Sequence, residues 1–366
     1  MDFFFDIMVD TGASDLHICS GAVPMLRLNG EMVPIKHPVM EPRDAYDLIH
    51  EIMPIKYRKE FAETHDVDFA YDLKDSARFR ANIFMDRKGI SAVFRQIPPT
   101  IFSLEKLGLP PIVKELCELE NGFIVVTGPT GSGKSTTLAS MIEYINKTRK
   151  VHIITIEDPI EYVHQNRLAL INQREVGVHT RNFRAALRAA LREDPDIVLV
   201  GEMRDLETIE IALETAETGH LVLATLHTST ATGTIDRIID SFPKGQQQQI
   251  RTMLSSTLKA VIAQNLLKRA DGTGLIAAFE TLMVTTGVAN TIREGKIHQI
   301  ETLMQAGKKH GMQTMQETLI ELVKKRLVTS DDAFRKAPDK TNFLRNLSYS
   351  GYVVNLTEKE KAKYRS

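Results

Sequence analysis

The chain has 366 residues, which is enough for two or three domains that each bury a core. Its hydrophobic content of 43% and charged content of 25% are those of an ordinary globular protein. A formal net charge of −1 excludes a global field that draws the chain to nucleic acid or anionic lipid. The two cysteines, Cys19 and Cys117, exclude a disulfide framework and a zinc site built on four cysteines.

The location of the protein is expected to be cytoplasmic. The first residues are acidic, and their apolar run is too short for a signal peptide. No apolar run approaches the roughly 20 residues that span a bilayer. Membrane contact is therefore expected only through partners.

Residues 1–97 are expected to form a smaller, PAS-like α+β domain. Residues 43–53 have the apolar spacing of a helix. Residues 77–84 and 90–97 alternate as strands and flank a turn at 86–89, which predicts a hairpin. Arg78 and Arg80 share one face of this hairpin, with Arg95 on the partner strand. These arginines either form a solvated face or act as arginine fingers on the nucleotide of a neighbouring subunit.

A proline-rich linker is expected at residues 98–111, between Pro98-Pro99 and Pro110-Pro111. Residues 112–366 follow as an α/β domain with a helical C-terminal part and a charged tail that is expected to fray. Buried-type strands at 123–127, 151–156, 197–200 and 221–225 alternate with helical segments. This alternation predicts a mostly parallel sheet covered by helices.

The sequence GPTGSGKST at residues 128–136 fits the phosphate loop, and it follows an apolar strand as that loop should. Its glycines let backbone N–H groups point at phosphate oxygens, and a helix begins at the same place. The alternative is a glycine-rich turn that binds nothing. We predict that ATP and Mg²⁺ are the cofactors, with Lys134 on the phosphates and Ser135 on the metal. The predicted nucleotide-binding residues here are Gly128, Thr130, Gly131, Ser132, Gly133, Lys134, Ser135 and Thr136.

Further chemistry is expected at the carboxyl ends of the strands, where an open parallel sheet binds ligands. Glu157, Asp158 and Glu161 follow one strand, and they either hold Mg²⁺ and orient water or form a solvated acidic turn. Gly201-Glu202 follows the next strand, where a Walker B segment commonly has Asp and then Glu. Glu202 is predicted to be the catalytic base.

Two histidines flank the strand at residues 221–225. His227 follows the strand and is predicted to hydrogen-bond the γ-phosphate. His220 precedes it and is either a structural residue or part of the nucleotide site.

A rival function rests on Arg181, Arg184, Arg188 and Arg192, whose spacing predicts one face of a helix. Such a stripe could hold nucleic acid, as in a nucleic-acid-stimulated motor. The chain is not basic overall and the stripe has no interleaved aromatic residues. A subunit interface or pairing with carboxylates is therefore favoured, and no nucleic-acid partner is expected.

These motifs together resemble the secretion ATPases that drive type II secretion and type IV pili. They occur in the expected order: the phosphate loop, residues 156–162, residues 173–177, residues 201–205 and residues 218–227. The N-terminal sequence Ser14-Asp15-Leu16-His17 also resembles the pilus retraction ATPases. The resemblance implies a homohexamer with nucleotide between two domains, and a glycine before Glu202 is typical of it. It assigns residues 157–161 to the Asp box, His220 and His227 to the His box, and Arg80 and Arg95 to the arginine positions.

The resemblance favours pilus retraction, because assembly and secretion ATPases usually carry a four-cysteine zinc insert that two cysteines cannot form. The resemblance also implies that residues 112–366 form a RecA-like P-loop NTPase domain. We expect ATP to close the two domains over it and phosphate release to open them. Successive firing would then displace a platform protein of the inner membrane. The C-terminal retraction motif is only partly present, at residues 289–294. A principal motor, an accessory paralogue and an assembly or secretion ATPase remain open.

Overall fold

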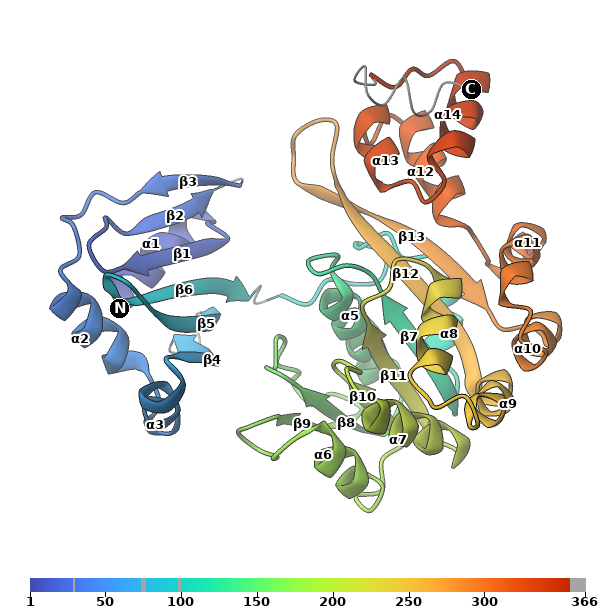
Figure 1. Ribbon diagram of the computed structural model, residues 1–366, viewed down its shortest axis with the longest axis horizontal. Coiled ribbons are helices and arrows are strands. Elements are labelled where there is room, and N and C mark those ends of the chain that lie inside the picture. The colour runs from blue at the N-terminus through green and yellow to red at the C-terminus, as the bar shows by residue number, and fades with distance from the viewer. Residues whose placement is uncertain (29, 74–76, 98–99, 356–366) are drawn as a thin grey trace. The chain divides into compact units, whose positions relative to one another are not determined.

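The computed structural model describes residues 1–28, 30–73, 77–97 and 100–355 (Figure 1). Contacts divide the chain into two units. One contains Met1–Ile101 with Pro159–Val163, and the other contains Phe102–Asp158 with His164–Ser366. The Pro98-Pro99 start of the expected linker and the charged tail lie outside the described residues.

The N-terminal unit is built on a six-stranded antiparallel sheet of order β3-β2-β1-β6-β5-β4. Alternate residues of β5 are buried, because one sheet face packs on a core that includes Phe79 and Ile83. The predicted hairpin, the helix near residues 43–53 and the α+β architecture are confirmed. The strands are β1 (Asp15–Cys19), β2 (Met25–Leu28), β3 (Glu31–Pro34), β4 (Asp66–Leu73), β5 (Ala77–Asp86) and β6 (Gly89–Ile97), and the helices are α1 (Asp2–Thr11), α2 (Pro42–Ile52) and α3 (Ile55–Thr64).

The second unit contains a seven-stranded sheet of order β13-β12-β7-β11-β10-β8-β9. Every neighbouring pair is parallel except β12 with β13, so the predicted mostly parallel sheet is confirmed. All four strands expected from the sequence are present within it. The strands are β7 (Gly122–Thr127), β8 (His152–Glu157), β9 (Leu170–Glu175), β10 (Ile197–Val200), β11 (Leu221–Leu226), β12 (Leu258–Lys268) and β13 (Leu275–Met283).

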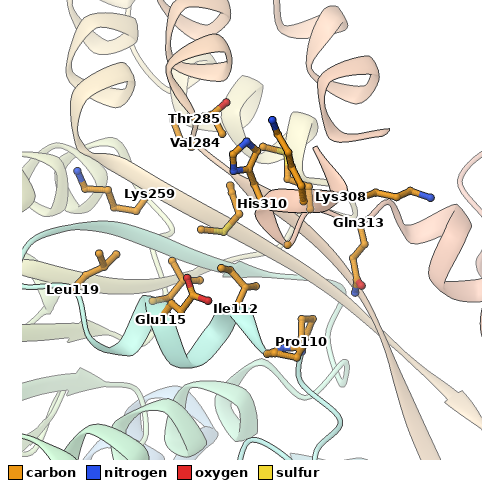
Figure 2. A pocket seen from close by; sticks show the side chains of 16 residues that line it. Pro110, Ile112, Glu115, Leu119, Lys259, Val284, Thr285, Lys308, His310 and Gln313 are labelled. Atoms are coloured by element: carbon orange, nitrogen blue, oxygen red, sulfur yellow. The ribbon is translucent and has the colours of Figure 1, made fainter. Parts of the chain in front are cut away.

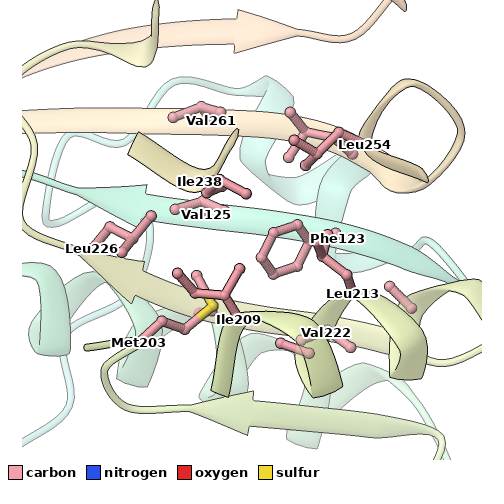
Figure 3. Packing of buried hydrophobic residues seen from close by; sticks show 14 of the residues in the cluster. Phe123, Val125, Met203, Ile209, Leu213, Val222, Leu226, Ile238, Leu254 and Val261 are labelled. Atoms are coloured by element: carbon pink, nitrogen blue, oxygen red, sulfur yellow. The ribbon is translucent and has the colours of Figure 1, made fainter. Parts of the chain in front are cut away.

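Helices cover both faces of this sheet, which explains why its central strands are apolar throughout. On one face, Phe123 and Val222 lie in the same core as Ile209 and Leu213 of α7 (Figure 3). On the other, Ile124 packs with the apolar side of α5. The first core also takes residues from α6 (Phe183–Ala190), α7 (Leu206–Glu217), α8 (Ala231–Asp240), α9 (Gln247–Thr257) and α10 (Thr286–Arg293), and the second from α4 (Ile112–Cys117) and α5 (Lys134–Thr148).

The C-terminal part forms a separate small core at the far ends of β12 and β13 (Figure 1). Leu319 and Phe343 are fully buried there beside Leu267 of β12 and Ala278 of β13. The helix α12 packs directly on β13, so this core is continuous with the sheet. The elements after α10 are η1 (Ile297–Gln299), α11 (Ile300–Ala306), η2 (Lys308–His310), α12 (Met315–Lys324), α13 (Ser330–Lys336) and α14 (Lys340–Tyr349).

The later part of the expected linker is packed against the second unit. Leu104 and Leu109 are buried in the same core as Val113 and Leu116 of α4. Burying two leucines outweighs the extended preference that prolines impose on the chain. Among the described helices, none combines the length and the apolar composition needed to cross a bilayer.

Candidate functional site

The phosphate loop connects the end of β7 to the start of α5, as its sequence predicts. Gly128, Gly131 and Gly133 have φ values of 151°, 74° and 87°, which L side chains rarely adopt. A Cβ on Gly128 would also lie 2.4 Å from the Gln264 carbonyl oxygen. The loop therefore needs glycine for its conformation and for its close approach to β12. The result is a backbone cradle at a helix N-terminus, where anions are favoured.

Gln264 of β12 holds this loop in place through its side-chain amide. No sequence motif predicted this contact. Gln264 is 2% exposed; its Nε2 donates to the Ser132 carbonyl at 2.6 Å, and its Oε1 accepts from Thr137 Oγ1 at 2.8 Å. One amide thus joins the loop to the first turns of α5. The available signal was the polar pair Gln264-Asn265 within the otherwise apolar run 260–267.

Lys134 is the first residue of α5 and is 8% exposed. Its ammonium donates to the carbonyls of Gly128 at 2.9 Å and Pro129 at 3.3 Å, so it lies against the loop that it follows. Ser135 and Thr136 are half-buried in the same helical turn, and Thr130 and Gly131 are exposed at the loop tip.

His227 joins Lys134 to Glu202. Its Nδ1 is 3.5 Å from Lys134 Nζ, and its Nε2 is 3.0 Å from Glu202 Oε1. An ammonium can only donate, so the neutral tautomer that fits both neighbours has its proton on Nε2. His227 follows β11, and Glu202 follows the neighbouring β10. The parallel register therefore brings both side chains to the edge of the sheet where β7 enters the phosphate loop.

Glu202 also contacts a cation on its other oxygen. Its Oε2 is 2.9 Å from Arg204 Nη2. Burial raises the pKa of Glu202, but the hydrogen bond and charge of Arg204, aided by the other cationic neighbours, outweigh burial and hold that pKa below its usual value. Glu202 is thus an ionised acceptor at neutral pH. We call Lys134, His227, Glu202 and Arg204 the nucleotide cluster.

The structure gives a steric reason for the glycine at the Walker B aspartate position. A Cβ on Gly201 would lie 3.1 Å from the Ile156 carbonyl oxygen and 3.2 Å from Glu157 Cα. The Gly201 N–H donates to that same carbonyl at 2.8 Å. The ends of β8 and β10 are therefore too close for a larger residue without a shift of the backbone.

Two carboxylates follow β8 at the same edge of the sheet. Glu157 Oε1 accepts from Thr155 Oγ1 at 2.7 Å and from Gln173 Nε2 at 3.2 Å, while Asp158 is exposed. Together with the Ser135 hydroxyl, these side chains offer oxygen ligands, which Mg²⁺ prefers. Among the described residues, no three His, Cys, Asp or Glu side chains form a ready-made metal centre. The residues present therefore fit a metal that also takes phosphate and water as ligands.

Hydroxyl groups connect the start of the phosphate loop to the segment after His227. Thr127 Oγ1 lies 2.7 Å from Thr228 Oγ1 and accepts from the Thr228 N–H at 2.9 Å. Thr228 Oγ1 is in turn 2.6 Å from Thr234 Oγ1 in α8. The loop and the histidine segment are therefore held as one unit.

His220 lies at the other edge of the sheet from the phosphate loop of its own chain, and its expected place in the nucleotide site stays a prediction. It precedes β11, and its carbonyl accepts from the N–H of Gly122, the first residue of β7. Its ring Nδ1 is 3.0 Å from the Thr215 carbonyl. The phosphate loop leaves the opposite end of β7, so His220 is at the other edge of the sheet. Its contacts support the structural alternative within its own chain.

Glu161 is half-buried in Pro159–Val163, a segment that contacts assign to the N-terminal unit. Glu157 and Asp158 belong to the other unit. Its expected catalytic role stays a prediction.

Three arginines form a charged face on the N-terminal sheet, which we call the arginine face (Arg78, Arg80 and Arg95). Arg80 is directly opposite Arg95 in the β5–β6 register, and Arg78 is two residues along β5. The predicted shared face is therefore confirmed. Each guanidinium contacts an aspartate on an adjacent strand: Arg78 with Asp72 at 3.0 Å, Arg80 Nε with Asp68 Oδ2 at 2.9 Å and Arg95 Nε with Asp15 Oδ1 at 2.8 Å.

Asp15 belongs to the N-terminal motif Ser14–His17 and is only 4% exposed. It is directly opposite Arg95 in the β1–β6 register and also accepts from Ser14 Oγ at 2.8 Å. The motif therefore positions one arginine of the arginine face.

The predicted arginine stripe is only partly helical. The helix α6 spans Phe183–Ala190, with Asn182 as its N-cap, so Arg181 and Arg192 lie outside it. The single-face prediction is wrong for these two residues. Arg184 Nη1 is 2.6 Å from Glu207 Oε2 of α7, which matches the expected pairing with carboxylates.

A cavity of about 660 Å³ lies at the opposite edge of the sheet from the phosphate loop (Figure 2). It is lined by α4 residues such as Glu115, by Lys259 at the start of β12 and by Val284 after β13. None of the predicted site residues is among the residues that line it.

Comparisons with known proteins agree with these motifs. Residues 4–341 match the family model described as "Type II/IV secretion system protein". The chain is 48% identical over 332 residues to the "Type IV pilus retractation ATPase PilT" of Pseudomonas aeruginosa, covering 91% of this chain and 96% of that protein. It is 51% identical over 314 residues to the "Twitching motility protein" of Neisseria gonorrhoeae, covering 86% and 84%.

A solved structure described as "Crystal Structure of the Pilus Retraction Motor PilT and Bound ADP" is also similar. It is 49% identical and superposes with a TM-score of 0.86 over 92% of this chain and 97% of that one. The match in sequence and in fold extends over both units. The chain therefore belongs to the type II/IV secretion system protein family, and its resemblance to the pilus retraction ATPases is confirmed.

Proposed function

We propose that this chain is the subunit of a homohexameric motor that hydrolyses ATP and retracts type IV pili. The observation that carries the proposal is the contact of Lys134, His227 and Glu202 beside the phosphate loop. The names of its relatives, a pilus retraction ATPase and a twitching motility protein, support the same function.

Binding of ATP follows from the loop. Its backbone N–H groups and the N-terminus of α5 take the phosphates, and Lys134 moves from the loop carbonyls to the β- and γ-phosphates. Ser135, together with Glu157 and Asp158 at the same edge of the sheet, would hold Mg²⁺, which would neutralise developing phosphate charge.

Hydrolysis requires a water that is oriented toward the γ-phosphate. The ionised Glu202 accepts a hydrogen bond from that water, and Arg204 and His227 hold the carboxylate in place. When Lys134 moves to the phosphates, it leaves the Nδ1 edge of His227, and that edge then faces the γ-phosphate while Nε2 stays on Glu202. This arrangement makes Glu202 a positioned acceptor of the water proton.

The arginine face completes the site of a neighbouring subunit. Arg80 and Arg95, with Arg78 beside them, exchange their aspartate partners for phosphate oxygens, which guanidinium groups match in geometry. Loss of the γ-phosphate removes those contacts and lets the two domains open. Successive openings act on an inner-membrane platform protein, so the motor is cytoplasmic and meets the membrane only at its periphery.

The test is a deletion of the gene in its host, complemented with wild type or with Glu202→Ala. Abundant surface pili without twitching, rescued only by wild type, are the expected result. Cells without pili would instead assign the chain to pilus assembly, and unchanged cells would contradict a principal retraction role. ATPase activity that rises strongly with added DNA or RNA would favour the nucleic-acid motor.

A further inference from the structure

Glu280 is a buried carboxylate that has no part in the nucleotide cluster. It lies on β13 and is 7% exposed. Its Oε1 accepts from the Ala231 N–H at 2.6 Å, and its Oε2 accepts from the Met315 N–H at 3.1 Å. Ala231 and Met315 are the first residues of α8 and α12. Each oxygen of this carboxylate therefore accepts a hydrogen bond from the first residue of a different helix.

The placement of this charge has a physical reason. Helix N-termini carry unpaired N–H groups and a partial positive charge, and both favour a carboxylate. Burial raises the pKa of Glu280, and the two backbone hydrogen bonds oppose part of that rise. The two helix ends thus offset part of the cost of burying this carboxylate, so the position of each helix end depends on the position of the other.

The start of α8 contacts the segment that follows His227 in the nucleotide cluster. Thr230 caps α8, and Thr234 in its first turn contacts Thr228, which follows His227. Thr228 contacts Thr127 at the start of the phosphate loop. The register gives the same neighbourhood, because Glu280 is opposite Ala263 of β12 and Ala263 is opposite Thr127 of β7.

The helix α12 forms part of the C-terminal core. Thr314 caps α12 in a capping box with Glu317, so the start of this helix is well fixed. Leu319 and Val323 of α12 are buried with Phe343 of α14. A shift at the α12 N-terminus therefore moves a helix that carries much of the C-terminal core.

We propose that Glu280 is a positioning residue that couples the His227 segment to the C-terminal helices through the N-termini of α8 and α12. The coupling rests on the proposed function, because ATP at the phosphate loop is what displaces His227 and Thr228. When α8 shifts, Glu280 either carries α12 with it or loses a buried hydrogen bond. The state of the nucleotide thereby reaches a part of the chain that forms none of the nucleotide cluster.

The test compares Glu280→Gln with wild type in the full chain. Glutamine keeps the shape, but its amide nitrogen donates, so it can accept from only one of the two helix ends. Glu301→Gln is the matched control, because Glu301 lines the same small cavity of about 70 Å³. Amide hydrogen exchange is measured by mass spectrometry in peptides that begin α8 and α12, with and without a non-hydrolysable ATP analogue and Mg²⁺.

In wild type and in the control, the analogue is expected to change exchange at both helix starts. In Glu280→Gln the change at α8 remains and the change at α12 is lost, while kcat falls about tenfold and KM for ATP stays within about twofold. If Glu280 had a purely structural role, the substitution would instead lower the unfolding temperature and alter hydrogen exchange across the whole unit. The responses of α8 and α12 to the analogue would then not differ.

Thr234→Val provides a second variant if Glu280→Gln does not fold, since it keeps the side-chain shape and removes the hydroxyl that meets Thr228. It is expected to lose the α12 response with Glu280 intact. An α12 response that persists in both variants, or that is absent in wild type while α8 responds, would overturn the coupling alone. If the analogue changed hydrogen exchange in no peptide of the wild-type protein, the proposed function would be overturned as well.

Discussion

The nucleotide cluster and the arginine face organise their charges in opposite ways. In the nucleotide cluster, Lys134, His227 and Glu202 contact one another beside an anion-binding loop. In the arginine face, Arg80 and Arg95 each contact an aspartate within the N-terminal sheet. The first group is therefore already arranged for phosphate chemistry. The arginines of the second group can bind phosphate only when they release their aspartate partners. Their contribution therefore depends on that exchange.

The largest effect is expected from Lys134→Ala, which removes the cation of the nucleotide cluster. Loss of this charge from a preorganised site should lower ATPase activity roughly a thousandfold and weaken ATP binding. Steady-state hydrolysis and equilibrium binding of a fluorescent ATP analogue measure both. Lys147→Ala, on the same helix but paired with Glu143, is the control and should leave both unchanged. A Lys134→Ala protein with wild-type affinity would show that the loop does not use this lysine.

Glu202→Gln separates binding from hydrolysis within the same cluster. The amide keeps the size of the side chain but loses its charge, so hydrolysis should fall roughly a hundredfold while ATP affinity stays within about threefold. Glu207→Gln, which breaks only the pair with Arg184, is the control. Wild-type turnover by Glu202→Gln would exclude Glu202 as the residue that orients water.

Asp68→Asn tests whether the arginine face is held back by its aspartates. Freeing Arg80 removes a partly exposed ion pair, so KM for ATP or kcat should improve by at most about fivefold. Asp72→Asn, on the same strand but paired with Arg78, is the comparison variant. If Asp68→Asn instead reduced turnover, the aspartate would hold Arg80 in its productive position, and the contrast between the two regions would be weaker.

Gly201→Ala is expected to have the smallest effect. The added methyl would meet the Ile156 carbonyl at 3.1 Å, so the strand ends must move apart, at a cost of about 1 kcal/mol in stability. Chemical denaturation measures this cost. Gly287→Ala is the control, because its Cβ would meet only Thr285 Oγ1 at 3.9 Å and alanine favours the helix. Equal stability of wild type and Gly201→Ala would remove the steric explanation for this glycine.

Local patterns were sufficient to predict much of the fold. The phosphate loop, the hairpin at β5 and β6 and the parallel strands each have a short-range signal in spacing or composition. The single-face arginine helix was wrong because an Asn182 cap starts the helix after Arg181, and the helix ends before Arg192. His220 precedes a parallel strand and therefore lies at the edge opposite the phosphate loop of its own chain, so its place in the nucleotide site stays a prediction.

Residues that act through distant contacts were not predictable in this way. Gln264 reaches the phosphate loop from 132 positions away. Glu280 meets Ala231 and Met315, which are far apart in the sequence. Only the register of the sheet brings such residues together, and a single sequence does not specify that register.

A mixing experiment tests most directly whether neighbouring subunits share an active site. Lys134→Ala supplies an intact arginine face, and Arg80→Ala combined with Arg95→Ala supplies an intact nucleotide cluster. Each preparation alone should be nearly inactive. Mixed and reassembled, they should regain ATPase activity that depends on the mixing ratio, because some sites then receive both intact halves. No recovery at any ratio would contradict a site completed by the arginines of a neighbouring subunit.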